Sequence, residues 1–78
     1  MKKKIQILGP GCAKCVKLAE NAEQAAREAG VEYEIEKVKD IKKIGEFGVM
    51  MTPAIAIDGV VKSVGKVLSP EDIKKYLK

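Results

Sequence analysis

Residues 4–29 predict a short strand, a tight loop and a long helix in direct succession. The strand, residues 4–8, is mostly apolar, and the loop that follows it is Gly9-Pro10-Gly11. Residues 13–29 are rich in alanine, and apolar side chains recur there at spacings of three and four, as on the buried face of a helix. These side chains belong to Cys15, Leu18, Ala19, Ala22, Ala25, Ala26 and Ala29. Because alanine is small, such a helix can lie close against a sheet, which indicates an α/β fold.

Two further elements follow this helix. Residues 31–38 alternate between apolar and charged side chains, which predicts a strand at a sheet edge, parallel to the first strand through the helical crossover. Lys37 continues the inward-facing side of this alternation. Asp40 can cap a short helix over residues 41–47, which Gly48 would end.

The last third of the chain predicts a hairpin and a final helix. Residues 54–57 and 60–64 flank Asp58-Gly59, a dipeptide typical of two-residue hairpin turns. Ser69-Pro70 is typical of a helix start, with serine as the cap and proline at the first helical position. The inward face of that helix is predicted to carry Ile73, Tyr76 and Leu77. The expected order of elements is therefore β-α-β-α-β-β-α, in one domain that spans residues 1–78.

Composition excludes several classes of partner. The net charge of +4 is spread along the chain, and one Phe and two Tyr offer little to stack on bases, so we expect no nucleic-acid partner. No run approaches the ~20 apolar residues of a membrane span, and the apolar run after the basic N-terminus is too short for a signal peptide. We therefore expect a soluble, cytoplasmic monomer.

The two cysteines, Cys12 and Cys15, lie where the first strand meets the first helix. Cys12 falls at or just before the helix N-terminus, where unpaired N–H groups and the helix dipole favour a thiolate. Cys15 lies one turn further on, at the top of the buried face, within disulfide reach. This arrangement favours thiol–disulfide exchange, with Cys12 as the nucleophile and Cys15 as the resolving cysteine. Lys14 adds positive charge nearby.

The order of elements, Cys12-Ala13-Lys14-Cys15 and the run from Gly48 to Thr52-Pro53 together resemble the thioredoxin fold in its small, glutaredoxin-sized form. The chain looks like the short thioredoxin-like redox-active disulfide proteins of archaea and bacteria. The resemblance implies a four-stranded mixed sheet in the order 2-1-3-4, flanked by three helices. It also implies a protein-disulfide oxidoreductase that serves electron transport and cell redox homeostasis. Such an enzyme needs no cofactor besides its own Cys12–Cys15 disulfide, and its partners are protein disulfide substrates and a reductase.

The same resemblance assigns roles to residues outside the cysteine pair. It implies that the Thr52–Pro53 bond is cis and lies against the cysteines, and that the Thr52 backbone pairs with an extended substrate segment. Gly65 would leave room for that segment on its other side. The expected substrate-binding residues are Gly11, Met51, Thr52, Pro53 and Gly65.

Three positions depart from the family pattern. Gly11 replaces the tryptophan that thioredoxins usually have just before the first cysteine. The acidic pair with which glutaredoxins bind the amine of glutathione is absent after Gly65, so glutathione is not the expected main partner. Gln6 replaces the buried acid that handles the proton of the resolving thiol, and an amide cannot accept that proton. Water or a neutral Lys37 amine remains as the acceptor for Cys15.

Two alternative roles for the cysteine pair stay open. A structural disulfide across so short a loop contributes only about 2 kcal/mol to the stability of the folded state, so it would stabilise the fold little. A Cu(I) carrier is the other alternative, because two thiolates after a Gly-rich loop suit a soft metal ion. Carriers of that kind end in a strand, however, whereas this chain is predicted to end in a helix. Zinc would need four ligands, and the chain has two Cys and no His, so we expect no zinc site.

Overall fold

The computed structural model describes residues 2–11 and 13–77. These residues form the predicted order of four strands and three helices. The elements are β1 (Lys3–Leu8), α1 (Ala13–Ala29), β2 (Tyr33–Val38), α2 (Ile41–Glu46), β3 (Ala54–Ile57), β4 (Val60–Val64) and α3 (Pro70–Leu77). Within the described residues, no helix is both long and apolar enough to cross a bilayer.

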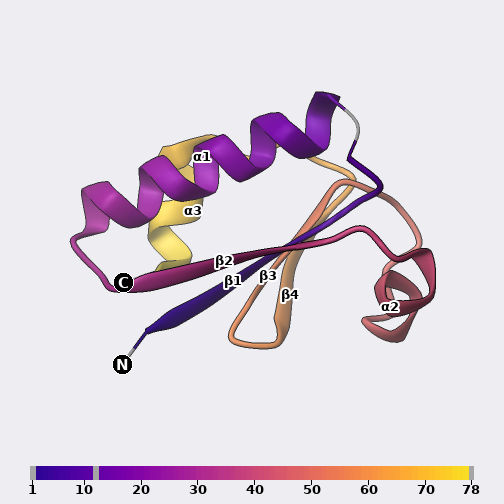
Figure 1. Cartoon of the computed structure of the whole chain (residues 1–78). Coiled ribbons are helices and arrows are strands. Elements are labelled where there is room, and N and C mark those ends of the chain that lie inside the picture. The colour runs from indigo at the N-terminus through magenta and orange to yellow at the C-terminus, as the bar shows by residue number, and fades with distance from the viewer. Residues whose placement is uncertain (1, 12, 78) are drawn as a thin grey trace.

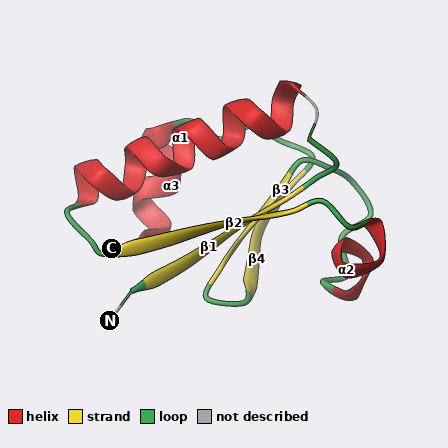
Figure 2. Ribbon diagram, viewed as in Figure 1, coloured by secondary structure: helices red, strands yellow, loops and turns green. Residues whose placement is uncertain are grey.

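The four strands form one mixed sheet in the order β2-β1-β3-β4, as the family resemblance implies. β1 runs parallel to β2 and antiparallel to β3, and β4 completes the sheet antiparallel to β3. Helices α1 and α3 lie together over one face, and α2 lies at the end of the sheet where β1 and β2 finish (Figure 1, Figure 2). The predicted α/β architecture is confirmed.

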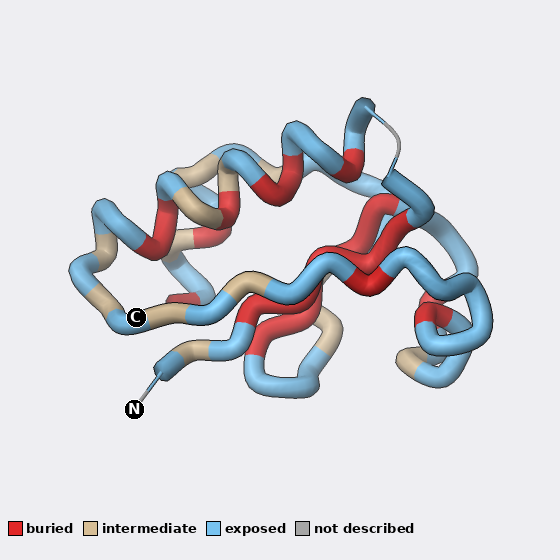
Figure 3. Tube along the Cα trace, in the orientation of Figure 1, coloured by how far each residue is buried: buried red, intermediate tan, exposed pale blue. Residues whose placement is uncertain are grey.

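The main core lies between the sheet and the pair α1 and α3. Ala22, Ala25 and Ala26 are fully buried there, so the alanine-rich stripe does bring α1 close to the strands. Figure 3 shows this stripe as a repeated band of buried residues along the lower side of α1. A second, smaller core lies under α2 on the other side of the sheet. Its buried members are Leu8, Val38, Ile44, Val49 and Ala54.

The β3–β4 hairpin has the predicted turn and is tied to β1. Asp58 and Gly59 both have positive φ, +53° and +83°, as a type I′ turn requires. The backbone N–H of Lys4 donates to Asp58 Oδ1 over 3.0 Å, and Lys3 Nζ lies 3.4 Å from Asp58 Oδ2. The bond from Lys4, with Lys3 assisting, lowers the pKa of the Asp58 carboxyl. One turn residue therefore joins the hairpin to the central strand.

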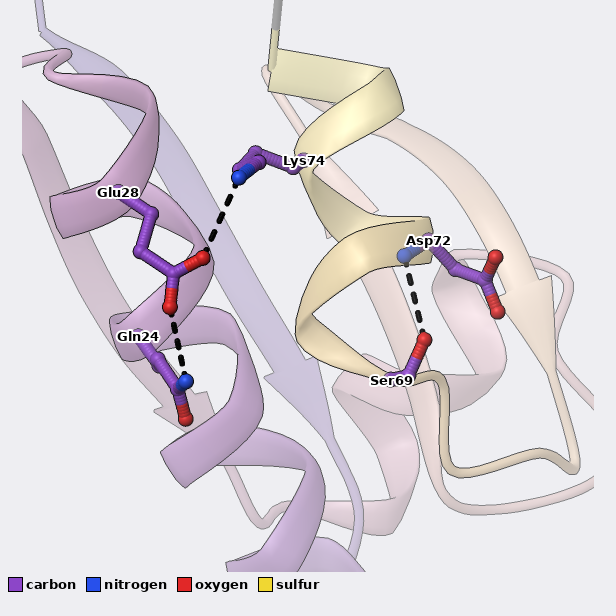
Figure 4. A network of polar contacts seen from close by, with 5 residues as sticks. All are labelled: Gln24, Glu28, Ser69, Asp72 and Lys74. Atoms are coloured by element: carbon purple, nitrogen blue, oxygen red, sulfur yellow. Dashed lines mark hydrogen bonds and ion pairs between the residues drawn. The ribbon is translucent and has the colours of Figure 1, made fainter.

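Polar contacts link α1 to α3 and cap the final helix, as Figure 4 shows. Ser69 Oγ accepts a hydrogen bond of 3.2 Å from the backbone N–H of Asp72, which confirms the predicted cap. Lys74 Nζ donates to Glu28 Oε1 over 3.2 Å, and Gln24 Nε2 donates to the other oxygen over 2.8 Å. These bonds, that of Gln24 first, lower the pKa of Glu28.

The prediction for the inward face of α3 is wrong at one position. Ile73 and Leu77 are buried as expected, but Tyr76 is 42% exposed. Its ring lies instead under the ammonium of Lys62, which is 5.7 Å from the ring centroid. The ring of Tyr76 therefore lies on the β4 side of α3, away from the core that buries Ile73 and Leu77.

Candidate active site

Cys15 lies in the first turn of α1 and faces the sheet. It is 4% exposed, so the expectation of a shielded second cysteine is confirmed. The stripe that buries Leu18 and Ala22 also buries Cys15, because all three occupy the same side of the helix. Cys12, the predicted nucleophile, lies outside the described residues, and its placement stays a prediction. Lys14, the residue before Cys15, is exposed.

Gly9 makes the space that the sulfur of Cys15 occupies. A Cβ atom on Gly9 would lie 2.3 Å from Cys15 Sγ and 3.8 Å from Thr52 Cβ. The backbone N–H of Gly9 donates to the carbonyl of Val38 over 2.9 Å, which fixes this residue just beyond β1. Only a glycine fits between Cys15 and Thr52 here. The sequence predicts Gly9 only as a loop residue and not as a residue of the site. The run Gly9-Pro10-Gly11 is the feature of the sequence that indicates a tight turn there.

The Thr52–Pro53 peptide bond is cis, as the resemblance implies. The Pro53 ring is buried, and its carbonyl accepts a 2.8 Å hydrogen bond from the backbone N–H of Gly65. Thr52 is exposed, and its backbone makes no hydrogen bond to any other described residue. The Thr52 backbone can therefore pair with an added chain segment. Because Thr52 lies close to Gly9, which in turn contacts Cys15, such a segment would lie beside Cys15.

The space beside Gly65 is not empty, because Met51 packs against it. A Cβ on Gly65 would lie 3.4 Å from Met51 Cε and 3.5 Å from Met51 Cβ. Gly65 has φ +70°, so its backbone also favours glycine. Met51 is 63% exposed and Met50 96% exposed, and Ile41 on α2 is exposed as well. Apolar side chains therefore border the open Thr52 backbone.

Lys37 shares a pocket with Cys15, and so does Lys39. Lys37 pairs with Ile7 in the β1–β2 register, which places it on the α1 side of the sheet, as predicted. The pocket has a volume of about 70 Å³. Lys39 Cε lies 3.8 Å from the point where a Cβ on Gly11 would stand, so Lys39 runs beside the loop. Lys39 is not among the predicted site residues, although it lies two residues beyond Lys37 and so continues the inward-facing side of the same alternation.

Gln6 is not brought together with Cys15. It alternates along β1 with Ile5 and Ile7, which pack under α1, so Gln6 points to the opposite face. There Gln6 Nε2 donates to Glu36 Oε1 over 2.8 Å, and this bond is the main cause of the lowered pKa of Glu36. Glu36 on the edge strand β2 therefore provides the hydrogen-bond partner that a buried polar side chain such as Gln6 needs.

The described residues contain no group of three or more His, Cys, Asp or Glu side chains that could hold a metal ion. The chemistry that this arrangement supports is exchange at sulfur. Its parts are a buried cysteine at a helix start, an adjacent open backbone and an apolar rim.

Comparison with known proteins gives consistent matches. The chain matches the family model described as a thioredoxin domain over residues 3–78. It is 47% identical over 74 residues to a thioredoxin of Methanothermobacter thermautotrophicus, covering 95% of this chain and 96% of that protein. It is 45% identical over 74 residues to a thioredoxin of Methanocaldococcus jannaschii, covering 95% of this chain and 85% of that protein.

Proposed function

The chain belongs to the thioredoxin domain family and is a protein-disulfide oxidoreductase, and from this premise we propose that Cys12 and Cys15 carry the exchange. The observation that carries the proposal is the burial of Cys15. A cysteine that is 4% exposed as a residue does not admit a protein disulfide, so the first attack falls to Cys12. Cys15 then acts only on a sulfur already held next to it, which is the role of a resolving cysteine.

The reaction transfers two electrons from the cysteine pair to the substrate. The Cys12 thiolate attacks one sulfur of a substrate disulfide, forms a mixed disulfide and releases the other substrate sulfur as a thiolate. The Cys15 thiolate then attacks the Cys12 sulfur and releases the second substrate thiolate. The protein is left with a Cys12–Cys15 disulfide, which is its only redox group, and a reductase must return both electrons.

The substrate segment is proposed to lie along Thr52. The open backbone of Thr52 can pair with an extended chain, as in the addition of a strand to a sheet edge. Met51 provides an apolar contact, and it must shift if the segment is to reach the backbone of Gly65. Gly11 is proposed to contact the segment from the loop. The buried Pro53 ring holds Thr52 in place rather than contacting the substrate itself.

Lys37 is the proposed acceptor for the proton of Cys15, directly or through water. Gln6 cannot take this role, because it is an amide and points to the other face of the sheet. Lys37 reaches the pocket that borders Cys15, and a lysine in its neutral form has a free electron pair.

We place the protein in the cytoplasm as a monomer that acts in electron transport and redox homeostasis, with protein disulfides as substrates and no cofactor. A test of the central proposal is reduction of insulin disulfides by the purified protein in the presence of a dithiol. The wild type is expected to accelerate this reduction, and Cys12→Ser is expected to abolish it. Equal rates for wild type and Cys12→Ser would contradict the proposal.

The alternative function, Cu(I) carriage by the same cysteines, gives the opposite results in two assays. A carrier would be inert towards insulin and would compete with a Cu(I) chelator at a ratio of one ion to one chain. We expect insulin reduction and weak competition, because the chain belongs to the thioredoxin domain family and has the open Thr52 backbone that exchange requires.

A further inference from the structure

The pocket beside Cys15 has a buried inner lining and an exposed outer lining. The inner lining consists of Ile7, Gly9 and Cys15. The outer lining consists of Gly11, Val16, Lys37 and Lys39. The volume of about 70 Å³ holds only a few groups the size of a water molecule. A substrate segment therefore stays outside this pocket, where it meets the exposed lysines.

Lys39 lies beside the loop that leads to Cys12. Its Cε atom is 3.8 Å from the point where a Cβ on Gly11 would stand. Gly11 directly precedes Cys12 in the chain and is proposed to contact the substrate segment. When a substrate cysteine is bonded to Cys12, the residues on either side of that cysteine are therefore within reach of the Lys39 ammonium.

Ion pairs hold the positive charges at the end of the sheet far from α2. The paired cations lie near the start of β1 and in the later turns of α1 and α3 (Figure 1), and they are Lys3, Arg27, Lys74 and Lys75. Around the other end, where β1 and β2 finish, the described lysines take no part in these ion pairs. They are Lys14, Lys17, Lys37, Lys39, Lys42 and Lys43.

Two carboxylates near these lysines already have other partners. Asp40 accepts the backbone N–H of Lys42 over 2.9 Å and so caps α2. Glu36 accepts its hydrogen bond from Gln6, on the sheet face opposite Cys15. The end of the molecule that carries the cysteines therefore keeps an excess of positive charge, which favours an acidic partner.

Lys39 is the less compensated of the two pocket lysines. Lys37 also lines a wider groove along α1 together with Glu20 and Glu23, and Lys39 is not part of that groove. A carboxylate brought by the substrate can therefore meet the charge of Lys39 without competition from the acids of α1.

We propose that Lys39 is a specificity-determining residue, which pairs with an acidic side chain next to the reacting cysteine of the substrate. The substrate class is then protein disulfides in which Asp or Glu flanks the cysteine that Cys12 attacks. The proposal rests on the proposed function, because it requires attack by Cys12. The ion pair adds no covalent step. Lys39 favours the first attack, and Lys37 keeps its separate role at Cys15 in the second.

The experiment measures the first attack by the reduced, full-length protein on three peptides. Each peptide carries its single cysteine as a mixed disulfide with 2-thiopyridine, and the peptides differ only in having glutamate, glutamine or lysine on both sides of that cysteine. Attack on the peptide sulfur releases 2-thiopyridone, whose absorbance gives the second-order rate constant. Each rate constant is divided by that of dithiothreitol, which removes differences in the reactivity of the peptides themselves. We expect the glutamate peptide to react fastest and the lysine peptide slowest.

Variants assign the preference to Lys39. Lys39→Gln is expected to lower the ratio of the glutamate to the glutamine peptide by about two- to fivefold, which is the usual contribution of an exposed ion pair. Lys39→Glu is expected to reverse the order, so that the lysine peptide reacts fastest. Lys17→Gln is the matched control, because Lys17 is exposed in α1, two residues beyond Cys15, and does not line the pocket. It removes the same charge and should leave the ratio unchanged.

A second readout does not depend on the rate. Cys15→Ser lacks the resolving thiol, so it should hold each peptide as a mixed disulfide on Cys12. In these trapped complexes, the resonances of Gly11 and of the Lys39 side chain are expected to differ between the glutamate and the glutamine peptide. Those of Lys17 should be the same in both.

Three results would overturn the role of Lys39. These are equal normalised rate constants for the three peptides, an equal loss of preference in Lys17→Gln, or an unchanged order in Lys39→Glu. If the wild type still reduces insulin with a dithiol, such results reject the specificity and leave the proposed function standing. Failure of the wild type to reduce insulin at all rejects the proposed function instead.

Discussion

Gly9 controls the active site by the side chain that it lacks. Any other residue at position 9 would place its Cβ only 2.3 Å from the sulfur of Cys15. No such contact is tolerated in a folded protein, so a substitution must displace either α1 or the end of β1. Gly45 offers a contrast within the same chain, since a Cβ there would meet nothing within 4 Å.

We predict that Gly9→Ala lowers the free energy of unfolding by about 1–3 kcal/mol, the usual cost of overpacking a tight contact. It should also slow insulin reduction, because Cys15 Sγ moves. Gly45→Ala, in helix α2, is the control and should leave stability unchanged or raise it by about 0.4–1 kcal/mol. Urea unfolding of both variants measures the difference, and a stable, active Gly9→Ala protein would contradict the assigned contact.

Cys15→Ser separates the two chemical steps. Because Cys12 can still attack while nothing resolves the product, we predict that this variant accumulates a mixed disulfide with a substrate protein. Non-reducing electrophoresis followed by mass spectrometry detects the adduct and places it on Cys12. The Cys12→Ser/Cys15→Ser double variant is the control and should form none. Absence of an adduct in Cys15→Ser would remove Cys15 from the resolving role.

At the scale of elements, the β3–β4 hairpin shows how a turn residue joins strands. Asp58 adopts the positive φ of the turn and accepts the N–H of Lys4 from β1. The carboxylate form is the better acceptor, so the folded state holds the pKa of Asp58 below its ordinary value of 3.8. The folded state therefore binds this proton less readily than the unfolded chain does.

The sign of the pH effect follows from that difference. Stability from Asp58 is fully present above about pH 4, where the unfolded chain also ionises this carboxyl, and is lost as pH falls through the lower folded pKa. We predict that Asp58→Asn weakens the dependence of stability on pH between about 4 and 2, since asparagine keeps the turn and the acceptor but cannot ionise. Urea unfolding at several pH values tests this. An unchanged pH profile would assign the acid sensitivity to other carboxyls, with Glu28 and Glu36 the next to substitute.

For the molecule as a whole, the distance between α1 and the sheet decides where Cys15 lies. Fully buried alanines set that distance, and α3 packs beside α1 over the same face (Figure 1). A larger side chain in this layer would push α1 outward along its length. The first turn, with Cys15, would then move away from Gly9 and Thr52.

We predict that Ala22→Leu lowers the free energy of unfolding by about 1–3 kcal/mol through overpacking and reduces exchange activity in parallel. Glu20→Leu, on the exposed side of the same helix, is the control and should stay within about 0.5 kcal/mol of wild type. Thermal and urea unfolding measure stability, and insulin reduction measures activity. A stable Ala22→Leu protein with normal activity would show that the layer can absorb the added volume.

Local signals determined the elements of this protein and the directions in which most of their residues face. The helix over residues 13–29, the hairpin at residues 54–64, the caps Asp40 and Ser69 and the burial of Cys15 all follow from neighbouring residues. Periodicity, turn chemistry and capping act over one or two turns, so the sequence alone carries them. The sheet order came from the likeness to a known family.

Only the tertiary structure decided which distant residues meet. It placed Gly9 between Cys15 and Thr52, brought Lys39 to the pocket, packed Met51 against Gly65 and turned Gln6 away from the cysteine towards Glu36. These contacts join segments that lie far apart along the chain, and their distances depend on how α1, β2 and the residues before β3 pack together. A local pattern carries no information about such distances, because close packing is a property of the assembled layers.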